Sequence, residues 1–242
     1  MITSHHLIGE TKLASRLKLR TGKKHGASTI AVIGLGRFGT ALALELVKTG
    51  REVLGIDSDE RLVQSNAEAL THVVQADSTD ESSLRELGIA EFDSAVVAIG
   101  SDLEASILTA SLLLQLGVPE VWAKATSVSH GRILEQLGVH HVIFPEMDMG
   151  KRVAHMVSGE SLDYIQLDED FVMAKTEVPD SFDGKTLADM KFRSNHGVTV
   201  VATRKQGSSY MPSFPETVLS AGDVMIVSGR TSKVEDFCRM GW

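Results

Sequence analysis

The glycine-rich stretch Gly34–Gly39 limits the possible fold more than any other part of the sequence. It reads Gly-Leu-Gly-Arg-Phe-Gly, follows the apolar run Ile30–Ile33 and leads into a helical pattern, Thr40–Lys48. In this setting the first glycine allows a sharp turn, the second lets a pyrophosphate approach the backbone, and the third lets the helix pack on the strand. Free amides at the helix start favour an anion. We assign to this phosphate site the residues Gly34, Gly36, Arg37, Phe38 and Gly39.

A carboxylate follows the glycines at the distance that a nucleotide site requires. The second apolar run, Val53–Ile56, ends at Asp57, about 20 residues further on, where such a group holds a ribose through its hydroxyls. The alternative is that Asp57 only caps a helix that starts near Asp59. The spacing favours the ribose. Because Asp57 ends a strand at the surface, we expect its removal to change stability little.

The stretch from Thr29 to Phe144 alternates strand and helix patterns. The later strands are expected at His72–Ala76, Ala95–Ile99, Val121–Ala125 and His141–Phe144. The run Ala95–Ile99 is fully apolar, as in a sheet covered on both faces. Six strands with intervening helices predict an α/β fold, a Rossmann-like doubly wound parallel sheet of order 3-2-1-4-5-6. In the helix Glu104–Leu116 we expect four residues to be buried, namely Ile107, Leu108, Leu112 and Leu116.

The ligand crevice of such a sheet lies outside the carboxyl ends of its strands. Asp57, Asp77, Gly100 and Lys124 fall at such ends. Asp77 either contacts an adenine or ribose edge or caps the next helix. Lys124 either contacts phosphate or pairs with Asp102. Arg37, in the glycine loop, is either solvated or bound to phosphate oxygens, which its planar fork suits.

After one more helix, predicted for Pro145–Val157, the regular alternation of strand and helix patterns ends. We divide the sequence into a basic tail (1–28), a nucleotide-binding domain (29–144), a crossover helix (145–159) and a smaller α+β domain (160–242). In the last part, strands are expected around 162–167, 171–178, 198–202 and 224–227, with helices at 187–190 and 231–240.

Charge and composition exclude several classes of protein. The net charge of −8 argues against broad nucleic-acid binding. Residues 1–28 carry six Lys or Arg and one Glu, a charge of +5 that leaves −13 for the rest. That tail is either disordered or contacts anionic lipid or the cytoplasmic face of a membrane partner. A single cysteine, Cys238, leaves no internal disulfide, and we expect a cytoplasmic protein.

The sequence offers no recognisable catalytic or metal-binding constellation. Of its nine histidines, two pairs are adjacent or in the tail, three are isolated, and His155 and His196 lack carboxylate or cysteine partners at ligand spacing. Neither H-E-x-x-H nor G-x-S-x-G occurs. The second domain has no evident pocket with a hydride acceptor's acid or base. Glu146, at a helix start, is interpreted from spacing alone as dipole compensation. The pattern favours a nucleotide-binding regulator over an enzyme.

Six stretches together resemble one known family. They are Ile30–Gly39, Asp57, Gln75–Asp77, Ala98–Gly100, Trp122–Ala125 and Phe144–Glu146. They look like the RCK (KTN) domain, the cytoplasmic regulator of potassium channels and transporters, with TrkA-type N and C domains. The Gly-Arg-Phe-Gly form resembles Ktr-type regulatory subunits, which prefer adenine nucleotides, whereas Trk-type subunits lean toward NAD. The part from about 160 to 242 resembles the RCK C-terminal subdomain.

The resemblance implies an assembly and assigns roles to residues. Members form homodimers, in which the helix after strand six crosses to the neighbour, and dimers build an octameric ring on a membrane subunit that carries potassium. ATP favours the conducting state and ADP the inactive one. Arg37 is assigned to the terminal phosphate, Asp57 to the ribose and Lys124 to the phosphate region. Glu146 becomes a cation ligand (Mg²⁺, Ca²⁺ or Na⁺) between nucleotides.

Three functions are compatible with these residues. The first is a gating regulator that binds ATP or ADP, the second an NAD-binding regulator on the same fold, and the third an NAD-dependent oxidoreductase. Asp57 suits either type of ribose, whereas Arg37 favours ATP. In some members the C-terminal subdomain binds cyclic di-AMP, for which Asn195 and His196 are candidates.

Overall fold

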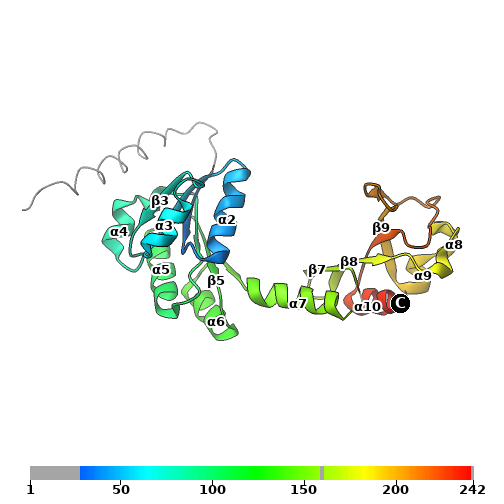
Figure 1. Ribbon diagram of the computed structural model, residues 1–242. Helices are drawn as coiled ribbons and strands as arrows, with labels where there is room; N and C mark the ends of the chain where they lie inside the picture. Colours follow the sequence, from blue (N-terminus) through cyan, green and yellow to red (C-terminus); the bar gives the residue numbers. More distant parts are fainter. Residues whose placement is uncertain (1–27, 159–160, 241–242) are drawn as a thin grey trace, which may run out of the picture. The chain divides into compact units, whose positions relative to one another are not determined.

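The computed structural model describes residues 28–158 and 161–240. They form two compact units that divide between Pro145 and Glu146 (Figure 1). The predicted basic tail lies, apart from residue 28, outside the described residues. None of the helices in the described part of the chain is both long and apolar enough to cross a membrane.

The first unit is built on a parallel sheet of six strands. Their bounds are β1 (Thr29–Ile33), β2 (Glu52–Asp57), β3 (His72–Gln75), β4 (Ser94–Val97), β5 (Glu120–Lys124) and β6 (His141–Ile143). The order is β3-β2-β1-β4-β5-β6, which confirms the predicted doubly wound topology. The order reverses between β1 and β4, so the crevice expected in such a sheet lies beyond the ends of those two strands.

Helices connect these strands in sequence. They are α2 (Arg37–Lys48), α3 (Glu60–Asn66), α4 (Glu81–Glu86), η1 (Ile89–Glu91), α5 (Leu103–Gln115) and α6 (Val128–Leu137). Figure 1 shows α2 on one side of the strands and α5 with α6 on another. Gly138 ends α6 in the left-handed conformation (φ 90°), which costs a glycine little.

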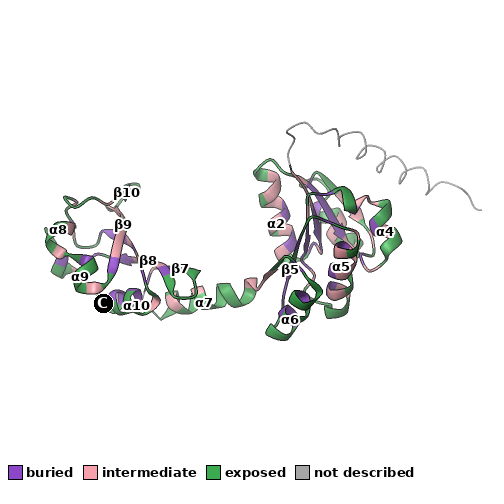
Figure 2. Cartoon of the chain, turned by 180° about the vertical axis from the view of Figure 1, so that it is seen from behind, coloured by how far each residue is buried: buried purple, intermediate pink, exposed green. Residues whose placement is uncertain are grey.

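Both faces of the parallel sheet are buried, and alternate residues of β1 serve the two sides. Ala31 and Ile33 belong to a cluster that includes residues of α4, α5 and α6. Val32 belongs to a second cluster with residues of α2 and α3. Figure 2 shows the buried residues concentrated in the strands. The fully apolar strands follow from this double burial.

The prediction for α5 is wrong for Leu108, whereas Leu112 and Leu116 are partly buried against the core as expected. Leu108 is 44% exposed, whereas the buried residues of the helix are Ser106, Thr109, Ala110 and Leu113. Small side chains let the helix approach closely, and Thr109 Oγ1 lies 2.8 Å from Ser78 Oγ in a buried hydrogen bond. Because α5 is apolar over most of its surface, hydropathy could not distinguish its inner face.

The second unit starts with most of α7 (Pro145–Val157), whose bounds equal the prediction. Arg152 of α7 binds Asp163 through Nε and Nη2, at 2.7 and 2.8 Å. This bidentate pair lowers the pKa of the Asp163 carboxyl. The ring of His155 stacks on Tyr164 with centroids 3.9 Å apart. These contacts attach the helix to the following strand.

An antiparallel sheet with short helices forms the rest of this unit. Its strands are β7 (Asp163–Asp168), β8 (Phe171–Glu177), β9 (Val198–Arg204), β10 (Met211–Pro212) and β11 (Val224–Gly229), in the order β10-β9-β11-β8-β7. The helices are η2 (Asp180–Phe182), α8 (Leu187–Met190), α9 (Phe192–His196) and α10 (Thr231–Arg239). The predicted smaller α+β fold is confirmed. The sequence patterns did not indicate β10, η2 or α9; Lys191, with φ 47°, separates α8 from α9.

Candidate functional site

The glycine loop after β1 is fixed by two backbone contacts that leave no room for side chains. Gly34 has φ 95°, and a Cβ there would lie 3.0 Å from the backbone of Ala98 and of Ile99. A Cβ on Gly39 would lie 1.8 Å from the carbonyl oxygen of Gly34. The first glycine therefore makes the turn and the third lets α2 pack on it, as expected.

Gly36 is different, because it faces open space. Apart from Gly36 itself and the adjoining chain, no atom of the protein lies within 4 Å of the position that a Cβ would take there. Gly36 is the N-cap of α2 and has no side chain to satisfy the first amides of the helix. In contrast, side chains cap the other helices of this unit that follow a strand, namely Asp59 on α3, Asp80 on α4, Asp102 on α5 and Ser127 on α6.

An uncapped helix start beside open space suits a phosphate group. The first-turn amides of α2 lack intrahelical acceptors and carry the positive end of the helix dipole. Arg37, the first residue of the helix, is exposed and adds a positive charge, and no acidic residue stands in that turn. The residues present therefore fit a nucleotide phosphate chain.

Asp57 links the glycine loop to the end of β2. One carboxylate oxygen accepts a hydrogen bond from the Leu35 amide at 2.6 Å, and the other from the Asp59 amide at 2.8 Å. The helix cap is Asp59, whose side chain accepts from the Arg61 amide. The capping alternative for Asp57 is therefore wrong. The expectation that its removal changes stability little does not fit this geometry either, because the amide of the buried Leu35 would lose its partner.

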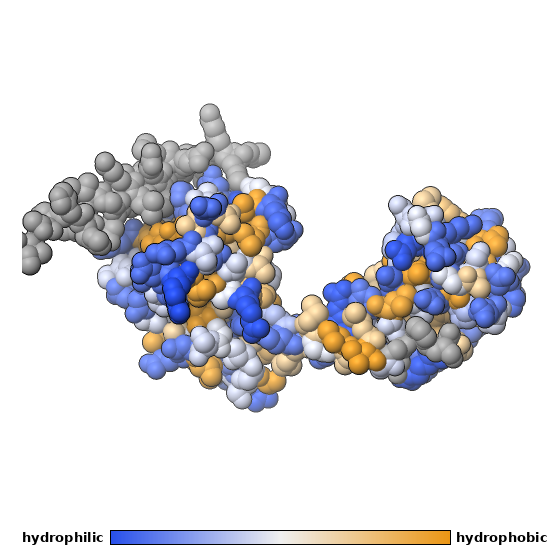
Figure 3. Space-filling model, viewed as in Figure 1, coloured by the Kyte–Doolittle hydropathy of each residue, from blue (hydrophilic) through white to orange (hydrophobic). Residues whose placement is uncertain are grey.

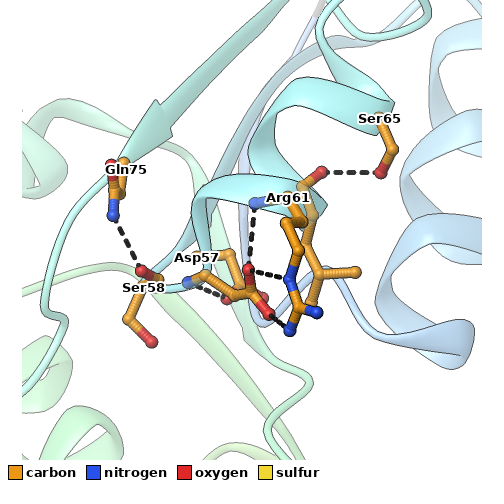
Figure 4. A network of polar contacts seen from close by, with 7 residues as sticks. Asp57, Ser58, Arg61, Ser65 and Gln75 are labelled. Atoms are coloured by element: carbon orange, nitrogen blue, oxygen red, sulfur yellow. Dashed lines mark hydrogen bonds and ion pairs between the residues drawn. The ribbon is translucent and has the colours of Figure 1, made fainter.

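Figure 4 shows the polar contacts around Asp57. Arg61 donates from Nη2 to Asp59 at 2.8 Å, and this contact lowers the pKa of the Asp59 carboxyl. Gln75, at the end of β3, donates to the carbonyl of Ser58 at 3.0 Å. The strand end that carries Asp57 is thus held by neighbours on both sides. Each carboxylate oxygen of Asp57 accepts one of these hydrogen bonds and can accept a second, for example from a ribose hydroxyl.

Lys124 ends β5 and is 8% exposed. Its Nζ lies 5.8 Å from the centre of the Phe38 ring in the glycine loop. A Cβ on Gly100 would lie 2.6 Å from the same nitrogen. Asp102, the alternative partner from sequence, accepts from the Ala105 amide at 3.0 Å as the cap of α5. The structure therefore brings Lys124, Phe38 and Gly100 together.

The other predicted site residues have simpler surroundings. Asp77 is exposed and accepts from the amide and hydroxyl of Thr79 at 2.9 and 2.7 Å. The cap of α4 is Asp80, so the capping alternative for Asp77 is wrong. Glu146 is exposed in the first turn of α7, at the start of the second unit. Among the described residues, no three His, Cys, Asp or Glu side chains converge on a possible metal site.

His130 is a buried residue near the crevice that the sequence did not single out. It is 2% exposed, and its Nδ1 lies 3.3 Å from the Thr126 amide, in the loop after β5. Nδ1 accepts this bond, so the neutral tautomer carries its proton on Nε2. Burial lowers the pKa of His130 below its usual 6.5. No sequence signal marks it, because an isolated histidine on a helix has no pattern.

The neutral state of His130 predicts a pH dependence of stability. The unfolded chain binds a proton at His130 near pH 6.5 and the folded chain only at lower pH, so stability is present above pH 6.5 and falls as the pH drops from there. Urea unfolding from pH 7.5 to 5.0 should show this loss, and it should be reduced in His130→Gln. Carboxylates contribute mainly below this window. An equal slope in both proteins would contradict the assignment.

A cavity of about 370 Å³ lies in the second unit. Lys191, Arg193, Ser213 and Phe214 are among the residues that line it. The two candidates for cyclic di-AMP binding are not. Asn195 Nδ2 donates to the carbonyl of Met190 at 2.9 Å. The ring of His196 packs on Phe237 with centroids 5.4 Å apart.

Comparison with known proteins identifies the domains of the chain and several of its relatives. The TrkA-N domain matches residues 30–145 and the TrkA-C domain matches residues 173–240. The Ktr system potassium uptake proteins C and A of Bacillus subtilis (strain 168) are 38% and 36% identical over 86% of this chain and 94% of each relative. The protein A of Vibrio alginolyticus is 35% identical over 87% of this chain and 96% of its own length.

Solved structures show the same fold. The crystal structure of the GsuK RCK domain superposes with a TM-score of 0.62 at 18% identity, over 90% of this chain and 48% of that one. The structure of the GsuK channel bound to NAD superposes with a TM-score of 0.62 at 18% identity, over 92% of this chain and 42% of that one. The present chain thus spans less than half the length of these structures. Matches to both domains, and more than one-third identity to relatives over almost their whole length, show that this chain belongs to the TrkA family that includes the Ktr system potassium uptake proteins.

Proposed function

We propose that the protein is a regulatory subunit of a potassium uptake system, which binds ATP or ADP and thereby controls a membrane subunit that moves potassium. The observation that carries the nucleotide part is the uncapped start of α2 beside the open space at Gly36. The transport part is supported by the relatives, which are named as Ktr system potassium uptake proteins. We propose no covalent chemistry and no nucleic-acid partner.

Each residue of the crevice has a role in this proposal. The first-turn amides of α2 hold the phosphates. Gly34 makes the turn of the loop, and Gly39 lets α2 pack against it. Asp57 holds the ribose, and Asp77 lies at the next strand end for the adenine or ribose edge. Lys124 and Gly100 face the phosphate region. The Asp57 contact to Leu35 supports this arrangement, because it fixes the ribose ligand and the phosphate loop together.

Arg37 is proposed as the contact to the terminal phosphate, so Arg37→Ala should weaken ATP more than ADP. One charge-assisted hydrogen bond contributes about 1.5–3 kcal/mol, so we expect ATP to bind roughly tenfold to hundredfold more weakly. A ligand can shift a conformational equilibrium only through such a difference in affinity. Calorimetric titration with both nucleotides checks it, with the exposed Lys48→Ala at the other end of α2 as control. Equal losses would leave Arg37 a general phosphate contact.

NAD(H) is the second candidate ligand. The same glycines and Asp57 suit a dinucleotide equally well, whereas Arg37 favours a terminal phosphate. An NAD-dependent oxidoreductase is disfavoured, because the sequence provides no acid or base motif for hydride transfer.

We further propose a homodimer that assembles into an octameric ring at the cytoplasmic face of the membrane. The support in this chain is α7, in which no residue is buried. Its apolar side chains include Met147, Met149, Val153 and Met156, each between 42 and 52% exposed. Figure 3 shows apolar side chains along this helix. An exposed apolar helix face of this kind favours association with another copy.

Two further ligands belong to the proposal. Glu146, an exposed oxygen donor, is proposed to bind Mg²⁺, Ca²⁺ or Na⁺ between the nucleotides of a dimer, because hard cations prefer oxygen ligands. Cyclic di-AMP is proposed to bind the second unit. The two cationic residues that line the cavity, Lys191 and Arg193, suit an anionic ligand. We therefore propose this cavity, in place of Asn195 and His196, as its binding site.

Titration of the purified protein with ATP, ADP, NADH and cyclic di-AMP tests these proposals. We expect ATP and ADP to bind with different affinities, and Mg²⁺ to strengthen ATP binding in wild type but not in Glu146→Gln. Binding of NADH alone would favour the second candidate. Failure of all adenine nucleotides to bind at millimolar concentration would contradict the proposed function.

A further inference from the structure

The end of the Lys124 side chain is close to two other elements of the first unit. Its residue is 8% exposed although it carries an ammonium group at the end of β5. Nζ lies over the Phe38 ring, 5.8 Å from its centre. Nζ and Cε also lie close to Gly100, just beyond β4. Thr126 Cγ2 lies 3.7 Å from the point that a Gly100 Cβ would occupy.

The end of the Lys124 side chain fits only because residue 100 is a glycine and has no Cβ. A Cβ there would lie 2.6 Å from Nζ and 2.9 Å from Cε of Lys124, distances that non-bonded atoms do not tolerate. The φ angle of Gly100 lies outside the left-handed region, so an alanine is not strained by its backbone. The atoms it would meet are the far end of a flexible side chain. The protein with Gly100→Ala should therefore still fold, but the Lys124 ammonium should be displaced from its position.

We propose that Gly100 and Phe38 are positioning residues that hold the Lys124 ammonium toward the phosphates of a bound nucleotide. Gly100 provides the space, and the negative face of the Phe38 ring attracts the cation. A side chain fixed in this way loses less conformational freedom when a phosphate binds. This inference rests on the proposed nucleotide function, which its test treats separately.

The first arm of the test needs no nucleotide. The ring current of Phe38 should shift the NMR signals of the Lys124 ε-methylene group in the ligand-free protein. We expect Gly100→Ala to move these signals toward the values of an exposed lysine. Phe38→Leu removes the ring current itself, so it serves to identify the shift that this ring causes. Ser101→Ala, at the exposed neighbour of Gly100, should leave the lysine signals in place, and both Gly100→Ala and Ser101→Ala should keep the unfolding midpoint of wild type. Unchanged Lys124 signals in folded Gly100→Ala would overturn the proposal.

The second arm is a double-mutant cycle read by ATP titration. Lys124→Ala should weaken ATP roughly tenfold to hundredfold, the loss expected for one charge-assisted contact. Gly100→Ala should cause a similar loss, but no further loss in a protein that already carries Lys124→Ala. If Gly100→Ala costs as much in both backgrounds, the new methyl group blocks the nucleotide directly and the positioning role is wrong. If wild type binds no adenine nucleotide, the proposed function fails, and the first arm still decides whether Lys124 is positioned.

Discussion

Gly36→Ala and Gly39→Ala, two substitutions in the same loop, should have opposite consequences. At Gly39 the new methyl group would lie 1.8 Å from the carbonyl oxygen of Gly34, which is backbone and cannot rotate away. Either the start of α2 or the loop must then move, and we expect a loss of about 3 kcal/mol or more in the free energy of unfolding. At Gly36 the methyl group meets no atom within 4 Å, so stability should change by less than about 0.5 kcal/mol.

The Gly36 substitution should weaken nucleotide binding although it should hardly change stability. The methyl group of Gly36→Ala would occupy the space beside the free amides of α2, where we place the phosphates. Loss of two charge-assisted hydrogen bonds, each about 1.5–3 kcal/mol, corresponds to a decrease in affinity of roughly a hundredfold or more. Urea unfolding and ATP titration of both variants check the pair. A folded Gly36→Ala protein that binds ATP like wild type would place the phosphates elsewhere.

Asp57→Ala should lower both affinity and stability. The carboxylate holds the Leu35 and Asp59 amides at 2.6 and 2.8 Å, and we propose that it also accepts from a ribose hydroxyl. Without it, ATP, ADP and NADH should all bind roughly tenfold to hundredfold more weakly in calorimetric titrations. The free energy of unfolding should fall by about 1–3 kcal/mol, because the amide of the buried Leu35 loses its acceptor.

Asp59→Ala is the matched control for this prediction. Asp59 is two residues away, caps α3 and binds Arg61 at the surface. Its removal should cost about 1 kcal/mol, the usual effect of losing a helix cap, and should leave nucleotide affinity unchanged. If the two variants affect nucleotide binding equally, Asp57 acts only through the local backbone and does not contact the ribose.

The sequence was sufficient for the architecture of the first unit. Apolar runs separated by helical patterns predicted six strands and their order, because parallel strands buried on both faces show little except hydrophobic residues. It was insufficient for α5, where several faces are apolar and small residues such as Ser106 and Thr109 form the contact. It also gave no sign of α9, because no pattern reveals that Lys191 adopts a left-handed conformation.

The candidate site was predictable in its parts but not in their contacts. The glycines and Asp57 follow from spacing, since each position of the motif has a separate steric or hydrogen-bonding reason. The contact of Asp57 with the Leu35 amide joins residues 22 positions apart. The approach of Phe38 to Lys124 joins α2 to β5. Both depend on how strands β1, β2 and β5 are placed in the sheet, which local patterns do not contain.

Potassium flux under control of the two nucleotides tests the central proposal most directly. Proteoliposomes carrying a Ktr-type membrane subunit would receive this protein with either ATP or ADP, and uptake of labelled rubidium would be measured. The proposed function predicts faster uptake with ATP than with ADP, and no difference between them when the protein is left out or carries Gly36→Ala. Equal uptake with both nucleotides in the presence of wild-type protein would contradict it.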